Sequence, residues 1–159
     1  MAFTLRVLFL LCGISGLFTG ALSDDSKKDD NCCPKDWTRL NNHCYIVRSD
    51  PRDFADSEEV CQLTHGNLAS VTSAVKNVVV YQLVLEQSLT DAWIGFHDAL
   101  ANGDFLWTDG SAPDAFTNFV GGAPADMGDC VIITTAGEWS DVACTEEHPY
   151  VCVTDACCH

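Results

Sequence analysis

Cysteine is the residue type in this sequence with the clearest chemistry. The 159 residues include 10 cysteines, and a set of this size points to metal ligands or to disulfides. The sequence has no Cys-x-x-Cys pair and no two histidines at ligand spacing, which disfavours a zinc site. The remaining interpretation is a disulfide framework, which requires an oxidising compartment.

The first residues indicate such a compartment. Arg6 is followed by an uncharged apolar run and then by small residues before an acidic pair at 24–25, the layout of a secretory signal peptide. We expect residues 1–23 to be removed after Ser23, with Ala21 as the second choice. The apolar run is shorter than the roughly 20 residues that cross a bilayer, so a membrane anchor is the weaker interpretation and we expect no membrane span. Cleavage also removes Cys12 and leaves 9 cysteines (10 − 1), an odd number.

Acidic side chains could bind cations. The net charge is −15, or −16 without Arg6, and after Lys76 the sequence has 13 Asp or Glu and no Lys or Arg. Such a surface repels phosphate backbones and anionic membranes, so nucleic acid is not an expected partner. Cations, basic proteins or positively charged surfaces fit better, and solubility alone explains the acidity equally well.

The histidines do not point to catalysis. They have no Cys or Asp partner at a recognisable catalytic spacing, and neither a Gly-x-Ser-x-Gly motif nor a phosphate loop is present. We therefore do not expect an enzyme. These histidines are His43, His65, His97, His148 and His159.

Two helices and several short strands must position these groups. Residues 24–31 are polar and predict a flexible acidic leader before a domain at 32–159 with a Cys-rich tail. After a strand at 44–47, Asp50-Pro51 predicts the start of a helix that runs to about Thr64. A second helix is expected from about Ser73 to Ser88, because apolar residues recur there on one helical face. That face comprises Val75, Val78, Val79, Gln82 and Leu83.

Strands dominate the second half. A buried strand is expected at 92–96 and three more at 130–134, 137–141 and 150–153. Between them, residues 97–129 are rich in Gly, Ala, Asp, Pro and Asn, and a connection of this length predicts a functional loop. The order of elements predicts the α+β class. We expect core positions for Trp93, Trp107 and Trp139. We expect four further residues to form either a small core of that loop or an exposed patch for a partner: Phe116, Phe119, Val120 and Met127.

Taken in order, these motifs resemble the long form of the C-type lectin and C-type lectin-like domain family. They are Cys33-Pro34-Lys35-Asp36-Trp37, Cys44-Tyr45, Cys61, Gly66-Asn67-Leu68-Ala69-Ser70-Val71, Trp93-Ile94-Gly95-Phe96, Trp107-Thr108-Asp109-Gly110, Asp129-Cys130, Trp139-Ser140-Asp141-Val142-Ala143-Cys144 and Tyr150-Val151-Cys152. The resemblance covers about residues 32–153. It implies two helices, small antiparallel sheets and a long irregular loop. It also implies the disulfides Cys33–Cys44, Cys61–Cys152 and Cys130–Cys144.

The resemblance also locates the sugar site. Family members bind calcium and sugar through Glu-Pro-Asn or Gln-Pro-Asp, where this sequence has Ala123-Pro124-Ala125. We expect Pro124 in the cis form. A later acidic ligand is replaced by Gly128, and the Trp-Asn-Asp motif reads Trp139-Ser140-Asp141, which leaves Asp141 as the one strong ligand. Because calcium takes 6–8 oxygen ligands, the usual sugar site is not expected to function.

A neighbouring calcium position keeps more oxygen ligands. The resemblance places Asp98, Asp126 and Asp129 at acidic ligands and Asn102 where glutamate is common. We expect either one weak structural calcium site or ordinary loop acids, since Asp is favoured in turns.

Three cysteines lie outside the family pattern: Cys32, Cys157 and Cys158. In the resembled fold the first and last strands pair, so we expect one bridge from Cys32 to Cys157 or Cys158. One thiol then remains, and because an odd thiol in a secreted protein tends to pair between chains, we expect a disulfide-linked homodimer. A free or capped thiol is the alternative, and Cys32 could also replace Cys33 as the partner of Cys44.

The sequence therefore predicts a secreted, extracellular recognition protein that lacks the usual calcium-dependent sugar site and binds a protein, a surface or a non-standard glycan. One alternative is a true calcium-dependent lectin. Another is an acidic structural component of an extracellular or mineral matrix.

Overall fold

The computed structural model describes residues 32–156. The expected signal peptide and leader, as well as Cys157 and Cys158, lie outside the described residues. The elements are β1 (Thr38–Leu40), β2 (His43–Arg52), α1 (Phe54–Leu63), β3 (Asn67–Leu68), α2 (Ala74–Glu86), β4 (Asp91–His97), β5 (Leu106–Trp107), the 3₁₀ turns η1 (Pro113–Ala115) and η2 (Val120–Gly122), β6 (Cys130–Thr134), β7 (Trp139–Val142) and β8 (His148–Asp155). The predicted α+β class is confirmed. Neither helix within this part of the chain is long and apolar enough to cross a membrane.

The strands form a single mixed sheet in the order β1-β2-β8-β4-β6-β7, with β3 paired to β8 and β5 to β4. The resemblance implied small antiparallel sheets. A parallel pairing of β4 with β8, where Trp93 lies opposite Tyr150, joins them. The antiparallel pairing of β2 with β8 brings the two ends of the domain together, and the Ala156 N–H donates to the Asn42 carbonyl at 2.7 Å.

All three predicted disulfides are present: Cys33–Cys44, Cys61–Cys152 and Cys130–Cys144. The Cys61–Cys152 bridge joins α1 to β8 across 91 residues of sequence. In the chain-entropy view, closing a loop of that length stabilises the folded state by about 4–5 kcal/mol. Cys32 is half-buried and has no disulfide partner among the described residues.

Helix α1 begins later than predicted. Asp50-Pro51 lies within the last part of β2, and Asp53 is the N-cap, whose carboxylate accepts from the Asp56 N–H at 2.8 Å. The Phe54 N–H donates to the Cys144 carbonyl at 3.0 Å. This contact with a distant segment anchors the first residue of the helix.

Helix α2 begins as predicted, with Ser73 accepting from the Lys76 N–H at 3.2 Å. Its fully buried residues are Asn77, Val80 and Val84, whereas Val75 and Val78 are exposed. The apolar face identified in the sequence is therefore turned partly to solvent. Valines occupy three consecutive positions from 78 to 80. Their spacing is therefore compatible with either of two adjacent helix faces being the buried one.

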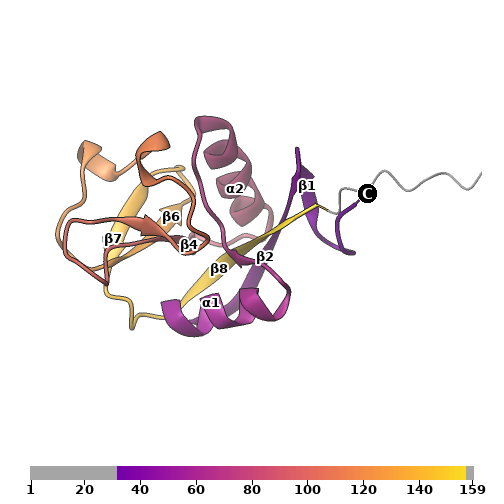
Figure 1. Ribbon diagram of the computed structural model, residues 1–159, viewed down its shortest axis with the longest axis horizontal. Helices are drawn as coiled ribbons and strands as arrows, with labels where there is room; N and C mark the ends of the chain where they lie inside the picture. The colour runs from indigo at the N-terminus through magenta and orange to yellow at the C-terminus, as the bar shows by residue number, and fades with distance from the viewer. Residues whose placement is uncertain (1–31, 157–159) are drawn as a thin grey trace, which may run out of the picture.

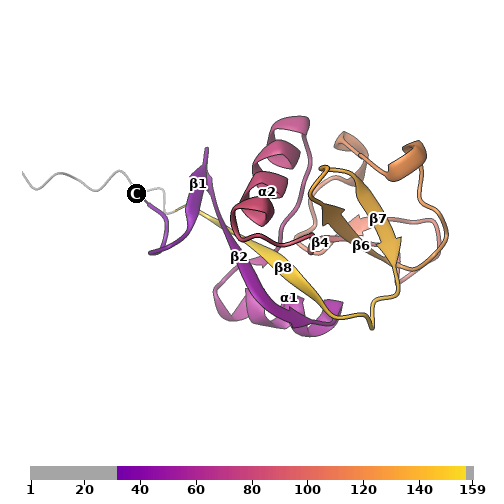
Figure 2. The same cartoon turned by 180° about the vertical axis from the view of Figure 1, so that it is seen from behind.

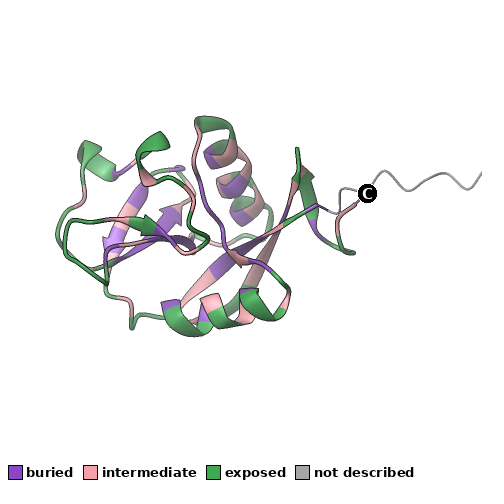
Figure 3. Cartoon of the chain, in the orientation of Figure 1, coloured by how far each residue is buried: buried purple, intermediate pink, exposed green. Residues whose placement is uncertain are grey.

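The core confirms the expectation for the tryptophans. Trp93, Trp107 and Trp139 are buried, as is Phe119 from the long loop. Phe96 lies at the centre of this group, 4.4 Å from Trp107 and 5.6 Å from Trp139 between ring centroids. The packing of these rings holds the long loop against the sheet, while most of the surrounding loop surface stays exposed (Figure 3).

The domain has two distinct ends. In Figure 1 the segment that leads from β4 to β6, coloured pink to orange, lies at one end, and β1 with the last residues of β8 lies at the other. The view from behind shows the same separation (Figure 2). The long loop is therefore remote from the ends of the described chain.

Candidate functional site

The predicted sugar position is closed by hydrogen bonds within the protein. Asp141, on β7, is only 3% exposed. One of its carboxylate oxygens accepts from the Ala125 N–H at 2.8 Å and the other from the Met127 N–H at 2.7 Å. Asp141, the one strong ligand expected from the motif, therefore binds the loop backbone.

The pKa of Asp141 reflects this environment. Burial alone would raise that pKa, but backbone N–H groups, chiefly those of Ala125 and Met127, lower it below the ordinary value for aspartate. The carboxylate therefore stays charged inside the protein.

The proline triplet differs from its expected form. All described peptide bonds are trans, so the prediction of a cis Pro124 is wrong. Ala123 and Ala125, which flank this proline, have no oxygen in their side chains. The Ala125 N–H is held by Asp141 instead.

The position of the missing acidic ligand also has no space for a side chain. A Cβ at Gly128 would collide with the backbone of Val142 and Ala143. The glycine allows two backbone segments to approach closely. An acidic ligand cannot be restored there without moving β7.

The residues predicted for the second calcium position line a common cavity. Asp98, Asn102, Asp126 and Asp129 line one cavity of about 140 Å³, together with Asp141. Asp98 is 6% exposed; its Oδ2 accepts from the Gly103 N–H at 2.7 Å, and its Oδ1 has no hydrogen-bond partner. A buried carboxylate oxygen without a donor fits a cation ligand. Nevertheless, in residues 32–156 no three acidic, histidine or cysteine side chains converge closely enough to hold a metal.

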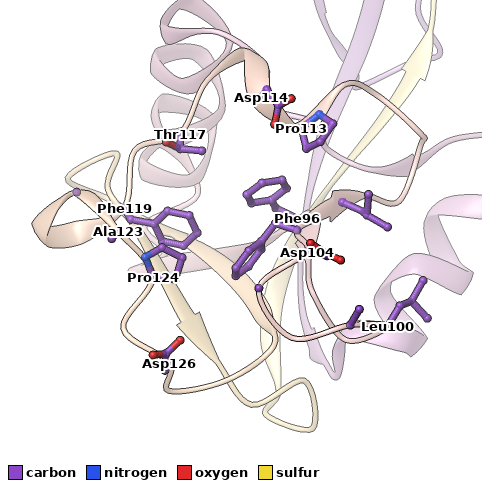
Figure 4. A pocket seen from close by; sticks show the side chains of 15 residues that line it. Phe96, Leu100, Asp104, Pro113, Asp114, Thr117, Phe119, Ala123, Pro124 and Asp126 are labelled. Atoms are coloured by element: carbon purple, nitrogen blue, oxygen red, sulfur yellow. The ribbon is translucent and has the colours of Figure 1, made fainter.

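A larger groove lies beside this cavity. It encloses about 780 Å³ between the 100–106 segment, η1 and the residues around η2. Figure 4 shows the rings of Phe96 and Phe119 inside it, with carboxylates on separate segments around them. The sequence analysis did not identify this groove, because its walls come from segments that only the fold brings together. Phe119 belongs to the loop core, whereas Val120 and Met127 are exposed, so both expectations for these loop residues hold in part.

The structure also shows a histidine–carboxylate pair that sequence spacing did not indicate. His148 Nδ1 lies 2.7 Å from Asp91 Oδ1, although the two are 57 residues apart. The His148 ring packs edge-on against Trp93 with 4.8 Å between centroids. The pair links β8 to β4 next to a core tryptophan.

A family model described as "Lectin C-type domain" matches residues 50–154. The chain belongs to the C-type lectin domain family.

Known members resemble this lectin-like domain over most of its length. The alpha-N-acetylgalactosamine-specific lectin of Patiria pectinifera is 31% identical over 165 residues, which cover 96% of each protein. The low affinity immunoglobulin epsilon Fc receptor of Mus musculus is 31% identical over 117 residues, 72% of this chain, and the chain spans only 34% of that receptor. Among solved structures, human lithostathine superposes with a TM-score of 0.73 at 29% identity, covering 77% of this chain and 99% of lithostathine.

Proposed function

We propose that this protein is a secreted recognition protein that binds its ligand through the long loop without the usual calcium-dependent sugar contacts. It is not proposed to be an enzyme. Residues 1–23 serve in this proposal as a signal peptide and 24–31 as a leader before the lectin-like domain.

The proposal rests on the hydrogen bonds that occupy the Asp141 carboxylate. Both oxygens of its carboxylate accept backbone N–H groups from the loop, and the neighbouring positions 123, 125 and 128 hold alanine or glycine. A bound calcium ion takes 6–8 oxygens, several of them charged. The position that supports sugar binding in the family offers too few.

The names of the relatives indicate that members of this family bind different classes of ligand. One is named for a sugar and another for an immunoglobulin, a protein. Membership in a fold family does not select between such ligands. For this chain the loop chemistry therefore weighs more than the family, and it favours a protein, a surface or a non-standard glycan.

Affinity chromatography tests the proposal directly. The protein is applied to mannose and galactose columns in millimolar calcium and then washed with EDTA, and the same preparation is screened on a glycan array with and without calcium. We expect it in the flow-through of both columns and no calcium-dependent array signal. Retention on either column with release by EDTA would refute the proposal and establish the alternative of a true calcium-dependent lectin. Strong binding to calcium carbonate or basic matrix as the sole signal would favour an acidic matrix component.

We further propose weak calcium binding in the cavity lined by Asp98, Asn102, Asp126 and Asp129. The unpartnered Oδ1 of Asp98 and the oxygen-rich lining support it. Calcium there would neutralise neighbouring carboxylates and stiffen the loop, and it would not contact a sugar through the 123–125 triplet.

A further inference from the structure

The groove described above has an aromatic floor. The Phe96 and Phe105 rings stack with 5.0 Å between centroids, and Phe105 meets Phe119 edge-on at 5.6 Å. Leu100 and Leu106 extend the apolar surface and are 80% and 42% exposed. A volume of about 780 Å³ is within the range that holds a ligand or several side chains of a partner.

The rim of the groove is acidic. Asp104, Asp114 and Asp126 line it from three different segments, and each is exposed. In Figure 4 their carboxylates stand on different sides of the phenylalanine rings. No Lys, Arg or His is among the described residues that line the groove, and the ion pairs within residues 32–156 include none of these three carboxylates.

This combination selects a ligand chemistry. Ring faces attract cations that approach within about 6 Å, and Arg and Lys side chains can lay their apolar stems along such surfaces. Three carboxylates around a concave apolar surface focus a negative potential that attracts cations and repels anions. The groove therefore disfavours phosphate, sulfate and sialic acid, and a cationic group attached to apolar atoms fits both floor and rim.

We propose that this groove binds a basic segment of an extracellular protein partner, with a Lys or Arg beside the half-buried ring of Phe105 and an adjacent apolar side chain against Leu100. The inference rests on the proposed function, since it names the partner class of the same loop. The groove is open, is bordered by two turns and lies at the end of the domain remote from the chain ends (Figure 1). A protein segment can therefore reach it without obstruction.

The test uses labelled peptides and the full mature protein. One peptide places Lys beside Phe between glycines; a second replaces the Lys by Glu, and a third replaces the Phe by Ala. Fluorescence anisotropy is measured in low salt and at 150 mM salt. We expect binding of the Lys-Phe peptide, weakened by salt because opposite charges at a surface are screened, no binding of the Glu peptide and weaker binding of the Ala peptide.

Variants locate the site. Asp104→Asn and Asp114→Asn should each weaken the Lys-Phe peptide by about two- to fivefold. Leu100→Ser should also weaken it, and because Leu100 is exposed this change leaves the fold intact. Glu59→Gln, which removes an exposed charge on α1, is the matched control and should have no effect.

Several results would overturn the inference: no binding of the Lys-Phe peptide, equal binding of the Glu peptide, or affinity unchanged in all three groove variants. A free aromatic amine that binds as tightly as the peptide would refute a protein segment as the ligand. These outcomes are distinct from failure of the proposed function, which is decided by the sugar columns, the glycan array and the matrix-binding assay.

Discussion

At the scale of single residues, Asp141 performs a structural task. Its two hydrogen bonds, at 2.8 and 2.7 Å, hold the turn that carries Ala125 and Met127. Charge-assisted bonds of this length are stronger than neutral ones. The residue that the family motif marks as a ligand is here a support for the loop.

This role predicts the effect of Asp141→Asn. The amide can accept fewer backbone N–H groups, so we expect a loss of about 1–3 kcal/mol in the free energy of unfolding. Because the pKa of Asp141 is lowered on folding, the charged carboxylate stabilises the native state at neutral pH, and this contribution is lost as pH falls below about 4 and through the folded-state pKa.

Thermal unfolding followed from pH 7 to pH 2 measures both effects. The parent should lose melting temperature more steeply at the acid end than Asp141→Asn does. Asp114→Asn, an exposed acid elsewhere in the loop, is the control and should follow the parent. Coincident acid profiles for Asp141→Asn and the parent would contradict the assigned role.

Calcium should stabilise the protein only slightly. A ligand stabilises the native state by RT ln(1 + [L]/Kd), which is about 0.4 kcal/mol when calcium equals its dissociation constant. We expect a small rise in melting temperature in millimolar calcium that Asp126→Ala abolishes and Asp104→Ala keeps. Asp104 lines the groove but not the calcium cavity, which makes it a suitable comparison. If calcium leaves the melting temperature of the parent unchanged, the proposed calcium site is wrong.

At the scale of elements, α2 is tied to β7 by polar contacts through Asn77. Its Nδ2 donates to the Gly137 carbonyl at 2.8 Å, and its Oδ1 accepts from Trp139 Nε1 at 2.7 Å. Asn77 is 5% exposed, so both bonds are protected from water. This buried amide fixes which face of the helix meets the sheet.

Asn77→Ala tests that arrangement. The change leaves the buried Trp139 N–H and the Gly137 carbonyl with one partner fewer each, and we expect a loss of about 1–3 kcal/mol in unfolding free energy. Val78→Ala, on the adjacent exposed position, should stay within about 0.5 kcal/mol. Denaturant unfolding compares the two variants, and an equal loss in both would show that the helix presents its valine face to the core.

Strands β2, β4, β6, β7 and β8 could be predicted from local patterns. The disulfide pairings came from the resemblance to the lectin family, and the helix faces could not be predicted. The apolar, β-branched run of β6 was expected over the same residues, 130–134, that the structure shows. The start of α1 was misplaced because both Asp50-Pro51 and Asp53 are acceptable helix starts, and the Phe54–Cys144 hydrogen bond comes from a segment remote in sequence. Motif order could locate Asp98 and Asp141. The hydrogen bonds that Asp141 accepts, and the groove around Phe105, depend on loop geometry that no local pattern encodes.

At the scale of the whole molecule, the two ends of the domain are chemically different. The long loop, with its acidic groove, occupies one end, and β1 with the end of β8 occupies the other (Figures 1 and 2). Cys32, the first described residue, is half-buried and packs against the hydrophobic cluster that contains Ala156, the last described residue. A link between two copies through this end would leave both loops free to bind.

The cysteine count makes such a link a specific prediction. If residues 1–23 are removed as a signal peptide, nine cysteines remain; three bridges use six of them and leave Cys32, Cys157 and Cys158. We expect Cys32 to bridge to Cys157 or Cys158, since Ala156 is held beside Asn42, and the third thiol to join two chains. Non-reducing electrophoresis of the protein, expressed for secretion, should show a band at twice the monomer mass that shifts to the monomer mass on reduction.

A combined Cys32→Ser, Cys157→Ser and Cys158→Ser variant provides the control. It keeps the three internal bridges, so it should fold and migrate as a monomer with or without reductant. If the parent also runs at monomer mass under both conditions, the covalent dimer is wrong and the odd thiol is free or capped, which mass spectrometry of the intact protein would distinguish. If the triple variant still forms a reducible dimer, the intermolecular bond must come from the three internal pairs, and the assignment of the odd thiol to this end of the domain fails.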